Sequence, residues 1–180
     1  ITTTNAGTGT GASDILTVGV PNIDKVFSPT PIQLGQNSTL TFTLGNGTNA
    51  AMTAVAFTDN FPAAPQQMVV ATPSTTTNTC GGTFTATAGA TSVNLTGATI
   101  PANSTCTVSV VVTVPTNGAA IATYNNTSGQ ITAAGPLNGN TASASLVVTQ
   151  AVPTVNKAFT TMGGLTVGGS QTLSFTVTQP

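Results

Sequence analysis

The chain of 180 residues contains no histidine, no tryptophan and no glutamate, and only five of its side chains are charged at neutral pH. Without histidine or glutamate, Ser–His–Asp and Cys–His catalytic arrangements cannot form, and a paired-carboxylate glycosidase would have to use scattered aspartates. The same absences leave no complete ligand set for zinc. We therefore expect a protein that is not an enzyme and that binds no cofactor.

Calcium would require several carboxylates close together. The chain has three aspartates, Asp14, Asp24 and Asp59, which lie far apart in the sequence. We therefore expect no calcium site.

Charged residues make up 3% of the chain and hydrophobic residues 39%, and the net charge is −1. Such a balance provides neither a basic patch for nucleic acid nor a polybasic segment for anionic lipid. No apolar run approaches the ~18 residues that a membrane helix needs, and the N-terminus lacks the regions of a signal peptide. We expect a segment of a mature exported protein whose weakly charged surface self-associates or carries sugar.

An internal repeat organises the sequence. The stretch from Pro21 to Leu44 returns, with one inserted residue, as the stretch from Pro153 to Val177. The only two basic residues, Lys25 and Lys157, occupy equivalent places in the two copies. The repeat of about 130 residues is the size of a domain rather than of a solenoid rung. We expect one complete unit at 21–152, the last strand or strands of a preceding unit at 1–20, and the first strands of a following unit at 153–180.

Period-two alternation of apolar and polar residues predicts strands throughout the unit. The clearest case is 38–44, STLTFTL, in which every second residue is apolar. The segment 23–27, IDKVF, should be an edge strand broken by Pro29 and Pro31, since proline cannot donate to a ladder. Residues 83–88 and 91–96 should form a hairpin, and 106–114 a central strand.

At least seven short strands separated by Gly, Pro and Asn turns, with no window of helical periodicity, predict an all-β fold: a β-sandwich with Greek-key connections, with a barrel as the alternative. Because tryptophan is absent, phenylalanine must fill the centre. The expected core residues are Phe42, Leu44, Val55, Phe57, Phe84, Leu95, Val108 and Val110.

The two cysteines, Cys80 and Cys106, most simply form one disulfide in a chain of exported character. Six asparagines begin an Asn-x-Ser/Thr tripeptide and are candidates for N-glycosylation. Chance alone produces many such tripeptides in a Thr-rich chain, and O-linked sugar on threonine is an alternative. The six are Asn37, Asn46, Asn94, Asn103, Asn125 and Asn126.

Asp59 lies in the segment FTDNFPA, before a proline-rich turn. The simplest interpretation is a turn residue whose carboxylate accepts backbone hydrogen bonds. The alternatives pair it with Lys25, either as a salt bridge or as the catalytic carboxylate of a Lys–Asn isopeptide crosslink of the kind found in some bacterial pilins. The sequence reveals no partner asparagine for that crosslink.

Four segments resemble a family of immunoglobulin-like repeats that occur in tandem in large bacterial surface proteins. They are KVFSPTPIQLGQNSTLTFTLGN, VAFTDNFPA, TNTCGGTFTA and TIPANSTCTVSVVVTV, and they cover most of 21–114. The resemblance implies an extracellular structural or adhesive module, usually one of many copies, and it implies that Cys80 and Cys106 are paired. The segment 61–65, FPAAP, departs from the family pattern, which usually has a glycine after the Pro–Ala.

We therefore expect a non-catalytic structural repeat of a fibre, stalk or filament on the outside of a bacterial cell, whose partners are neighbouring copies or repeats of itself. One alternative is a pilin-like subunit that polymerises by strand donation. Another is a ligand-binding adhesin domain, although the chain has one tyrosine and no tryptophan to build an aromatic platform for surface glycans.

Overall fold

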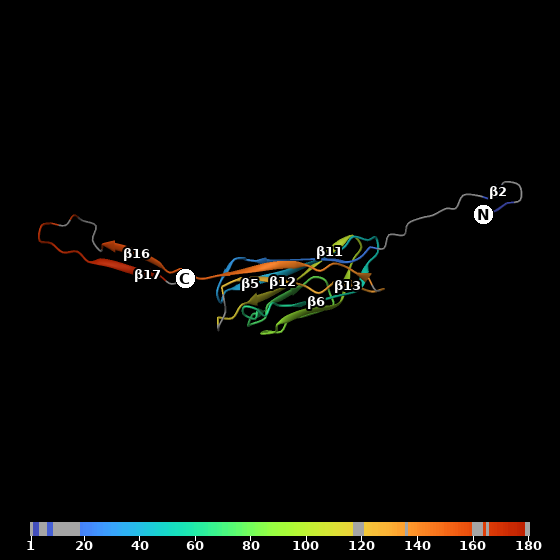
Figure 1. Cartoon of the computed structure of the whole chain (residues 1–180), viewed down its shortest axis with the longest axis horizontal. Helices are drawn as coiled ribbons and strands as arrows, with labels where there is room; N and C mark the ends of the chain where they lie inside the picture. Colours follow the sequence, from blue (N-terminus) through green and yellow to red (C-terminus); the bar gives the residue numbers. More distant parts are fainter. Residues whose placement is uncertain are drawn as a thin grey trace.

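The computed structural model describes residues 2–3, 7–8, 19–116, 121–135, 137–159, 164 and 166–178. Within these ranges every regular element is a strand, and no helix long and apolar enough to cross a membrane is present. The strands of 22–149 form a β-sandwich, and a separate hairpin follows it (Figure 1). The predicted all-β class is confirmed.

The first sheet is built around β5 (Asn37–Asn46) and β11 (Ser104–Thr113), which pair antiparallel along their whole length. β3 (Asn22–Ser28) forms one edge beside β5. The short strands β7 (Val69–Val70) and β8 (Thr76–Asn78) pair with the other side of β11. β11 is therefore the central strand that its continuous apolar sequence predicts.

The second sheet has the strand order β14-β13-β6-β10-β9. Its long members are β6 (Met52–Asn60) and β10 (Ser92–Ile100), which pair antiparallel. β9 (Thr83–Thr85) pairs with β10, as the predicted hairpin requires. β13 (Thr132–Ala133) and β14 (Leu137–Asn138) complete the other edge.

A third, smaller sheet contains β12 (Thr123–Thr127), β15 (Ser143–Thr149) and β4 (Ile32–Gln33). β15 lies beside β3 and β12 beside β6, so this sheet closes one side of the sandwich. β15 and β4 are parallel. The predicted split of the first strand is confirmed, because the chain leaves β3 at the prolines and resumes as β4 in another sheet.

The segment 124–133, YNNTSGQITA, contributes to two strands, β12 and β13, in different sheets. Gly129 lies between them, and its N–H donates to the carbonyl oxygen of Thr58 at 2.8 Å. A Cβ atom at this position would lie 2.9 Å from that oxygen. The close approach to β6 thus breaks the strand at a residue without a side chain.

The connections between the two larger sheets follow a Greek key. The chain crosses from β5 to β6 and returns from β10 to β11, so that the long neighbours in each sheet, β5 with β11 and β6 with β10, are far apart in sequence. Phe42 of β5 meets Phe57 of β6 with ring centroids 4.8 Å apart. All the expected core residues are buried except Phe84, which is half-buried.

After the sandwich, β16 (Thr154–Phe159) and β17 (Leu173–Thr178) form an antiparallel hairpin that pairs with no other described strand. At the other end, β1 (Thr2–Thr3) pairs with β2 (Gly7–Thr8). The strand-like stretch 15–20, expected to end a preceding unit, lies outside the described residues apart from Gly19 and Val20, which are not in a strand.

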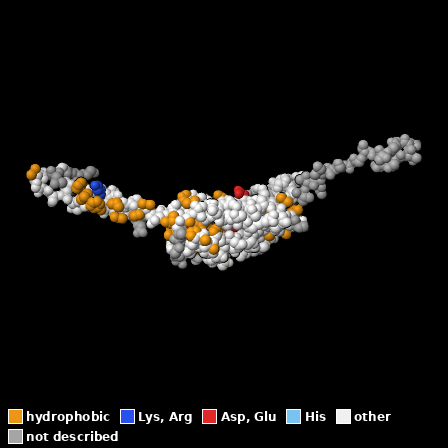
Figure 2. All heavy atoms as spheres, in the orientation of Figure 1, with side chains coloured by type: hydrophobic (Ala, Val, Ile, Leu, Met, Phe, Trp, Pro, Cys, Tyr) orange, Lys and Arg blue, Asp and Glu red, His pale blue; other side chains and the backbone are white. Residues whose placement is uncertain are grey.

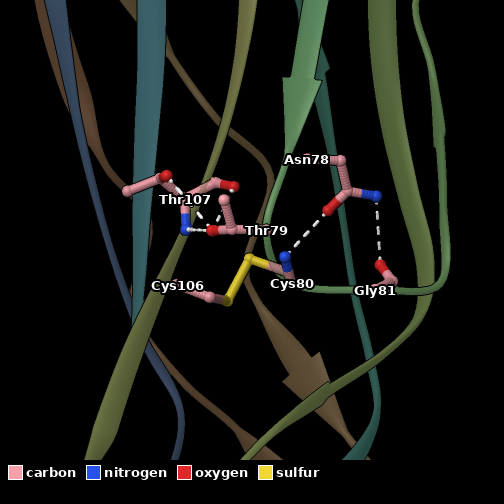
Figure 3. Close-up of a disulfide and its surroundings, with 6 residues drawn as sticks. All are labelled: Asn78, Thr79, Cys80, Gly81, Cys106 and Thr107. Carbon is pink, nitrogen blue, oxygen red and sulfur yellow. Dashed lines mark hydrogen bonds between the residues drawn. A yellow bond between two sulfur atoms is a disulfide. The ribbon is translucent and has the colours of Figure 1, made fainter.

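The predicted disulfide is present. Cys80, in the connection between β8 and β9, is bonded to Cys106 of β11, and their Cα atoms are 5.0 Å apart (Figure 3). The Asn78 side chain accepts a hydrogen bond from the Cys80 N–H and donates one to the Gly81 carbonyl oxygen. Thr79 and Thr107 exchange hydrogen bonds beside it. The disulfide therefore fastens the short β8–β9 connection, 79–82, to the central strand.

Replacing Phe42 with alanine should lower the free energy of unfolding by about 3–5 kcal/mol, because it leaves a cavity against Phe57. The matched control is Phe175→Ala, which changes the repeat-equivalent residue in the exposed hairpin. Urea unfolding followed by circular dichroism should show little change for Phe175→Ala. Equal losses for the two variants would show that Phe42 does not occupy the core.

Replacing both cysteines with alanine should lower the free energy of unfolding by ~3.5 kcal/mol, the chain-entropy value for a loop closed between residues 26 positions apart. The measurement is denaturant unfolding of the double variant beside the unsubstituted chain, both without reductant. Alkylation of the denatured, unreduced chain should label neither cysteine, and labelling of both would contradict the disulfide.

Candidate functional site

Lys25 is a charged residue at a core position. In β3 the inward residues alternate with exposed ones, and Lys25 occupies the inward place between Ile23 and Phe27. It is 4% exposed, and its Nζ atom lies 5.2 Å from the centre of the Phe42 ring. A lysine on the buried face of a strand requires a partner, because an unpaired buried ammonium is strongly destabilising.

The partner is Asp59 of β6. Both of its carboxylate oxygens lie 3.0 Å from Lys25 Nζ, and Asp59 is fully buried. The interpretation of Asp59 as a turn residue is therefore wrong: it belongs to a strand and points into the core with Phe57 and Val55. Of the alternatives considered for this pair, the salt bridge is present.

A third residue, Asn126 of β12, completes the site. Its Nδ2 atom donates to Asp59 Oδ2 at 2.8 Å, and the residue is 2% exposed. The sequence pattern predicts Asn126 only as a glycosylation candidate. A period-two pattern nevertheless indicated burial, because Tyr124 and Asn126 of β12 and Ser128 just after it are all inward, and the residues between them are exposed.

The three side chains converge where the three sheets meet, since β3, β6 and β12 belong to different sheets. Burial lowers the pKa of the Lys25 amine, and the charge and hydrogen bonds of Asp59 act in the opposite direction. Burial likewise raises the pKa of the Asp59 carboxyl, opposed by Lys25 and by the hydrogen bond from Asn126. Burial thus works against both charges, and their pairing and hydrogen bonds work against that effect.

Two of the six glycosylation candidates do not fit that role. Asn126 is buried in this site, and Asn46 is 2% exposed. The Asn46 Nδ2 atom, to which a glycan would be attached, already donates to the carbonyl oxygens of Ala50 and Ile100. The other four remain candidates: Asn37, Asn103 and Asn125 are exposed, and Asn94 is half-buried.

The sequence profile of a family described as a domain of unknown function, DUF7933, matches residues 21–148. The match covers the sandwich and all three residues of the site. No curated relative matches the sequence.

Two structures of BcpA, the major pilin subunit of Bacillus cereus, share the fold, with TM-scores of 0.54 and 0.52 at 12% and 14% identity. Each alignment covers 76% of this chain and 42% of the pilin, so the chain spans less than half of the pilin's length. The third cohesin of ScaC from Acetivibrio cellulolyticus, solved in complex with the ScaB dockerin, has a TM-score of 0.50 at 15% identity over 71% of this chain and 99% of the cohesin. At these identities the likeness concerns the fold.

Replacing Asp59 with alanine should lower the free energy of unfolding by about 3–5 kcal/mol, because it leaves the Lys25 amine buried without its carboxylate. The control is Asp24→Ala. Asp24 is next to Lys25 in the sequence but is exposed, so its loss should change the free energy of unfolding by no more than about 0.5 kcal/mol. Thermal or urea unfolding of the two variants measures the difference. A neutral effect of Asp59→Ala would contradict the pairing.

Proposed function

Because this chain belongs to the DUF7933 family of domains of unknown function, we propose its role from its architecture: it is a non-catalytic structural repeat of an extracellular bacterial fibre, stalk or filament. Its partners are neighbouring repeats of the same kind. The proposal depends chiefly on one observation, the equivalence of the β16–β17 hairpin and the β3–β5 pair.

The two strand pairs have the same register. In the sandwich Lys25 lies opposite Phe42, and in the hairpin Lys157 lies opposite Phe175. Phe27 and Phe159 likewise face the equivalent leucines, Leu40 and Leu173, in their partner strands. The repeated sequence therefore adopts the same local structure twice, which supports the interpretation of 153–178 as the start of a second unit.

The hairpin exposes the face that the sandwich buries. Phe42 and Leu44 have no exposed surface, whereas their equivalents Phe175 and Val177 are 62% and 66% exposed. Figure 2 shows hydrophobic side chains gathered along this hairpin, while most of the visible sandwich surface is polar. An exposed apolar ribbon with unpaired edges favours association with further strands. The remaining strands of a following sandwich would cover it.

The connection between the units supports a stiff assembly. Only 150–153, QAVP, separates β15 from β16, and it contains no Gly/Ser linker. Consecutive units should therefore be held semi-rigidly, as a stalk or filament requires. The sequence resemblance to immunoglobulin-like repeats of bacterial surface proteins supports the extracellular location.

The structural neighbours support two roles, a fibre subunit and a protein-binding domain, and we favour the first. A pilin subunit shares the fold, which supports the fibre. The pilin likeness also keeps strand donation between separate subunits as the second candidate, since the hairpin offers an uncovered face to another copy. A cohesin bound to a dockerin supports a protein-binding domain, but few aromatic side chains are available for a binding tip, so we rank this role lower.

A chimera tests the tandem arrangement. Joining Thr178 to Asn46, so that the chain continues through a second copy of 46–152, places the hairpin where β3 and β5 would lie. We expect a monomer with two sandwiches, because the second copy supplies the strands that cover Phe175 and Val177. Binding of a hydrophobic dye should fall relative to the original chain, and light scattering should report one chain per particle.

The matched control carries Phe175→Ser in the chimera and should lose the folded second sandwich while the first persists. If the unsubstituted chimera still exposes its hairpin, the tandem role is wrong. If the original chain assembles into fibres whose denatured mass is that of one chain, strand donation is favoured instead.

A further inference from the structure

The Lys25–Asp59–Asn126 site contains a third polar group, the Asn126 amide, beside the two groups that form the salt bridge. Lys25 Nζ and Asn126 Nδ2 are both within hydrogen-bond distance, 3.0 and 2.8 Å, of the same atom, Asp59 Oδ2. The amine and the amide are thus held side by side by one carboxylate. None of the three side chains is more than 4% exposed, so bulk water does not compete for them.

The Asn126 amide is left incomplete by this arrangement. Its Oδ1 atom is buried and accepts no hydrogen bond. A buried acceptor without a donor is destabilising, and native structures contain few of them. A protonated Asp59 would supply the missing donor, because it has one O–H to direct at that oxygen.

Burial favours the neutral forms of Lys25 and Asp59, and a neutral Asp59 has the O–H that can donate to Asn126. It lowers the pKa of Lys25 and raises that of Asp59, so the Lys25 proton can pass to the carboxylate 3.0 Å away. The products are a neutral amine, which has a lone pair, and a neutral carboxylic acid. A desolvated lysine amine is a nucleophile, and an acid beside a carbonyl oxygen polarises it.

We propose that Lys25 and Asn126 join in an intramolecular isopeptide bond, with Asp59 as the group that carries the proton. The inference goes beyond the proposed fibre role and is independent of it, because all three residues lie within one sandwich.

The reaction needs no reagent beyond these side chains. The Lys25 Nζ lone pair attacks Asn126 Cγ while Asp59 donates a hydrogen bond to Oδ1. Asp59 then takes a proton from Nζ and delivers one to Nδ2, the Cγ–Nδ2 bond breaks, and ammonia leaves. A Cγ–Nζ amide replaces the Cγ–Nδ2 amide, no atom is oxidised or reduced, and the chain loses the mass of one ammonia molecule.

The product satisfies the site better than the reactants do. The new amide is uncharged, so the core no longer contains an ammonium. Its oxygen accepts from the protonated Asp59, and its N–H lies next to the Asp59 carbonyl oxygen. The crosslink would also join β3 to β12, two strands separated by most of the unit.

The chain itself provides a direct test, because Lys25 and Lys157 are its only trypsin sites. Intact mass of the denatured, reduced, full-length protein should be lower than the sequence mass by one ammonia. Trypsin should then cut after the exposed Lys157 but not after Lys25, whose amine is now an amide. The fragments should be 1–157 and 158–180.

Variants assign the bond to its residues. Asn126→Ala and Asp59→Ala should each have the mass calculated from their own sequence, without loss of ammonia, and trypsin should cut each of them after Lys25. The matched control, Asn125→Ala, changes the exposed neighbour on the same strand and should still lose ammonia. Tandem mass spectrometry of a chymotryptic digest should identify one branched peptide containing Lys25 and Asn126.

Two outcomes overturn the proposal. One is the full sequence mass for the unsubstituted chain when circular dichroism shows it to be folded. The other is loss of ammonia with cleavage after Lys25, which would indicate succinimide formation at an Asn–Gly step such as Asn46–Gly47. Both measurements use the unsubstituted protein, so neither depends on whether the variants fold.

Discussion

Two opposite charges, Lys25 and Asp59, lie inside a largely apolar core, and each makes the burial of the other tolerable. The pair also constrains strand register. A slip of β3 by one residue would turn Lys25 toward solvent and leave the Asp59 carboxylate buried without a cation. Because β3 and β6 belong to different sheets, the constraint extends across the sandwich, and Asn126 extends it to a third sheet. The site therefore helps to fix how strands from three different sheets pack against one another.

The parts of the fold that local pattern determines could be predicted from the sequence. Strict alternation around Leu40, Phe42 and Leu44 predicted β5 and its inward face, and the continuous apolar run after Cys106 predicted a central strand. Proline chemistry predicted where the first strand would divide. These signals are strong because each arises from residues a few positions apart. The short strands β8 and β14 have no such pattern, and their place depends on the neighbours with which they pair.

Only part of the candidate site could be predicted. Lys25 and Asp59 were considered together, but the turn-like composition around Asp59 favoured a local role that tertiary structure overrides. Asn126 lies 67 positions from Asp59, and no local rule relates them. Its inward phase beside Tyr124 was readable, yet an asparagine in an Asn-x-Ser/Thr tripeptide suggested the surface. Local sequence patterns do not give the order of the strands in the sheets, and it is this order that brings the three side chains together.

The parallel pairing of β4 with β15 has a mechanical consequence. The chain enters the sandwich along β3 and β4 and leaves along β15 in the same direction, so its two connections lie at opposite ends, and in Figure 1 the C-terminal hairpin lies beyond one of them. Tension along the polypeptide would then load these strands in shear, and their hydrogen bonds would have to break together rather than one after another. Such a unit resists pulling along its length far better than peeling from its side.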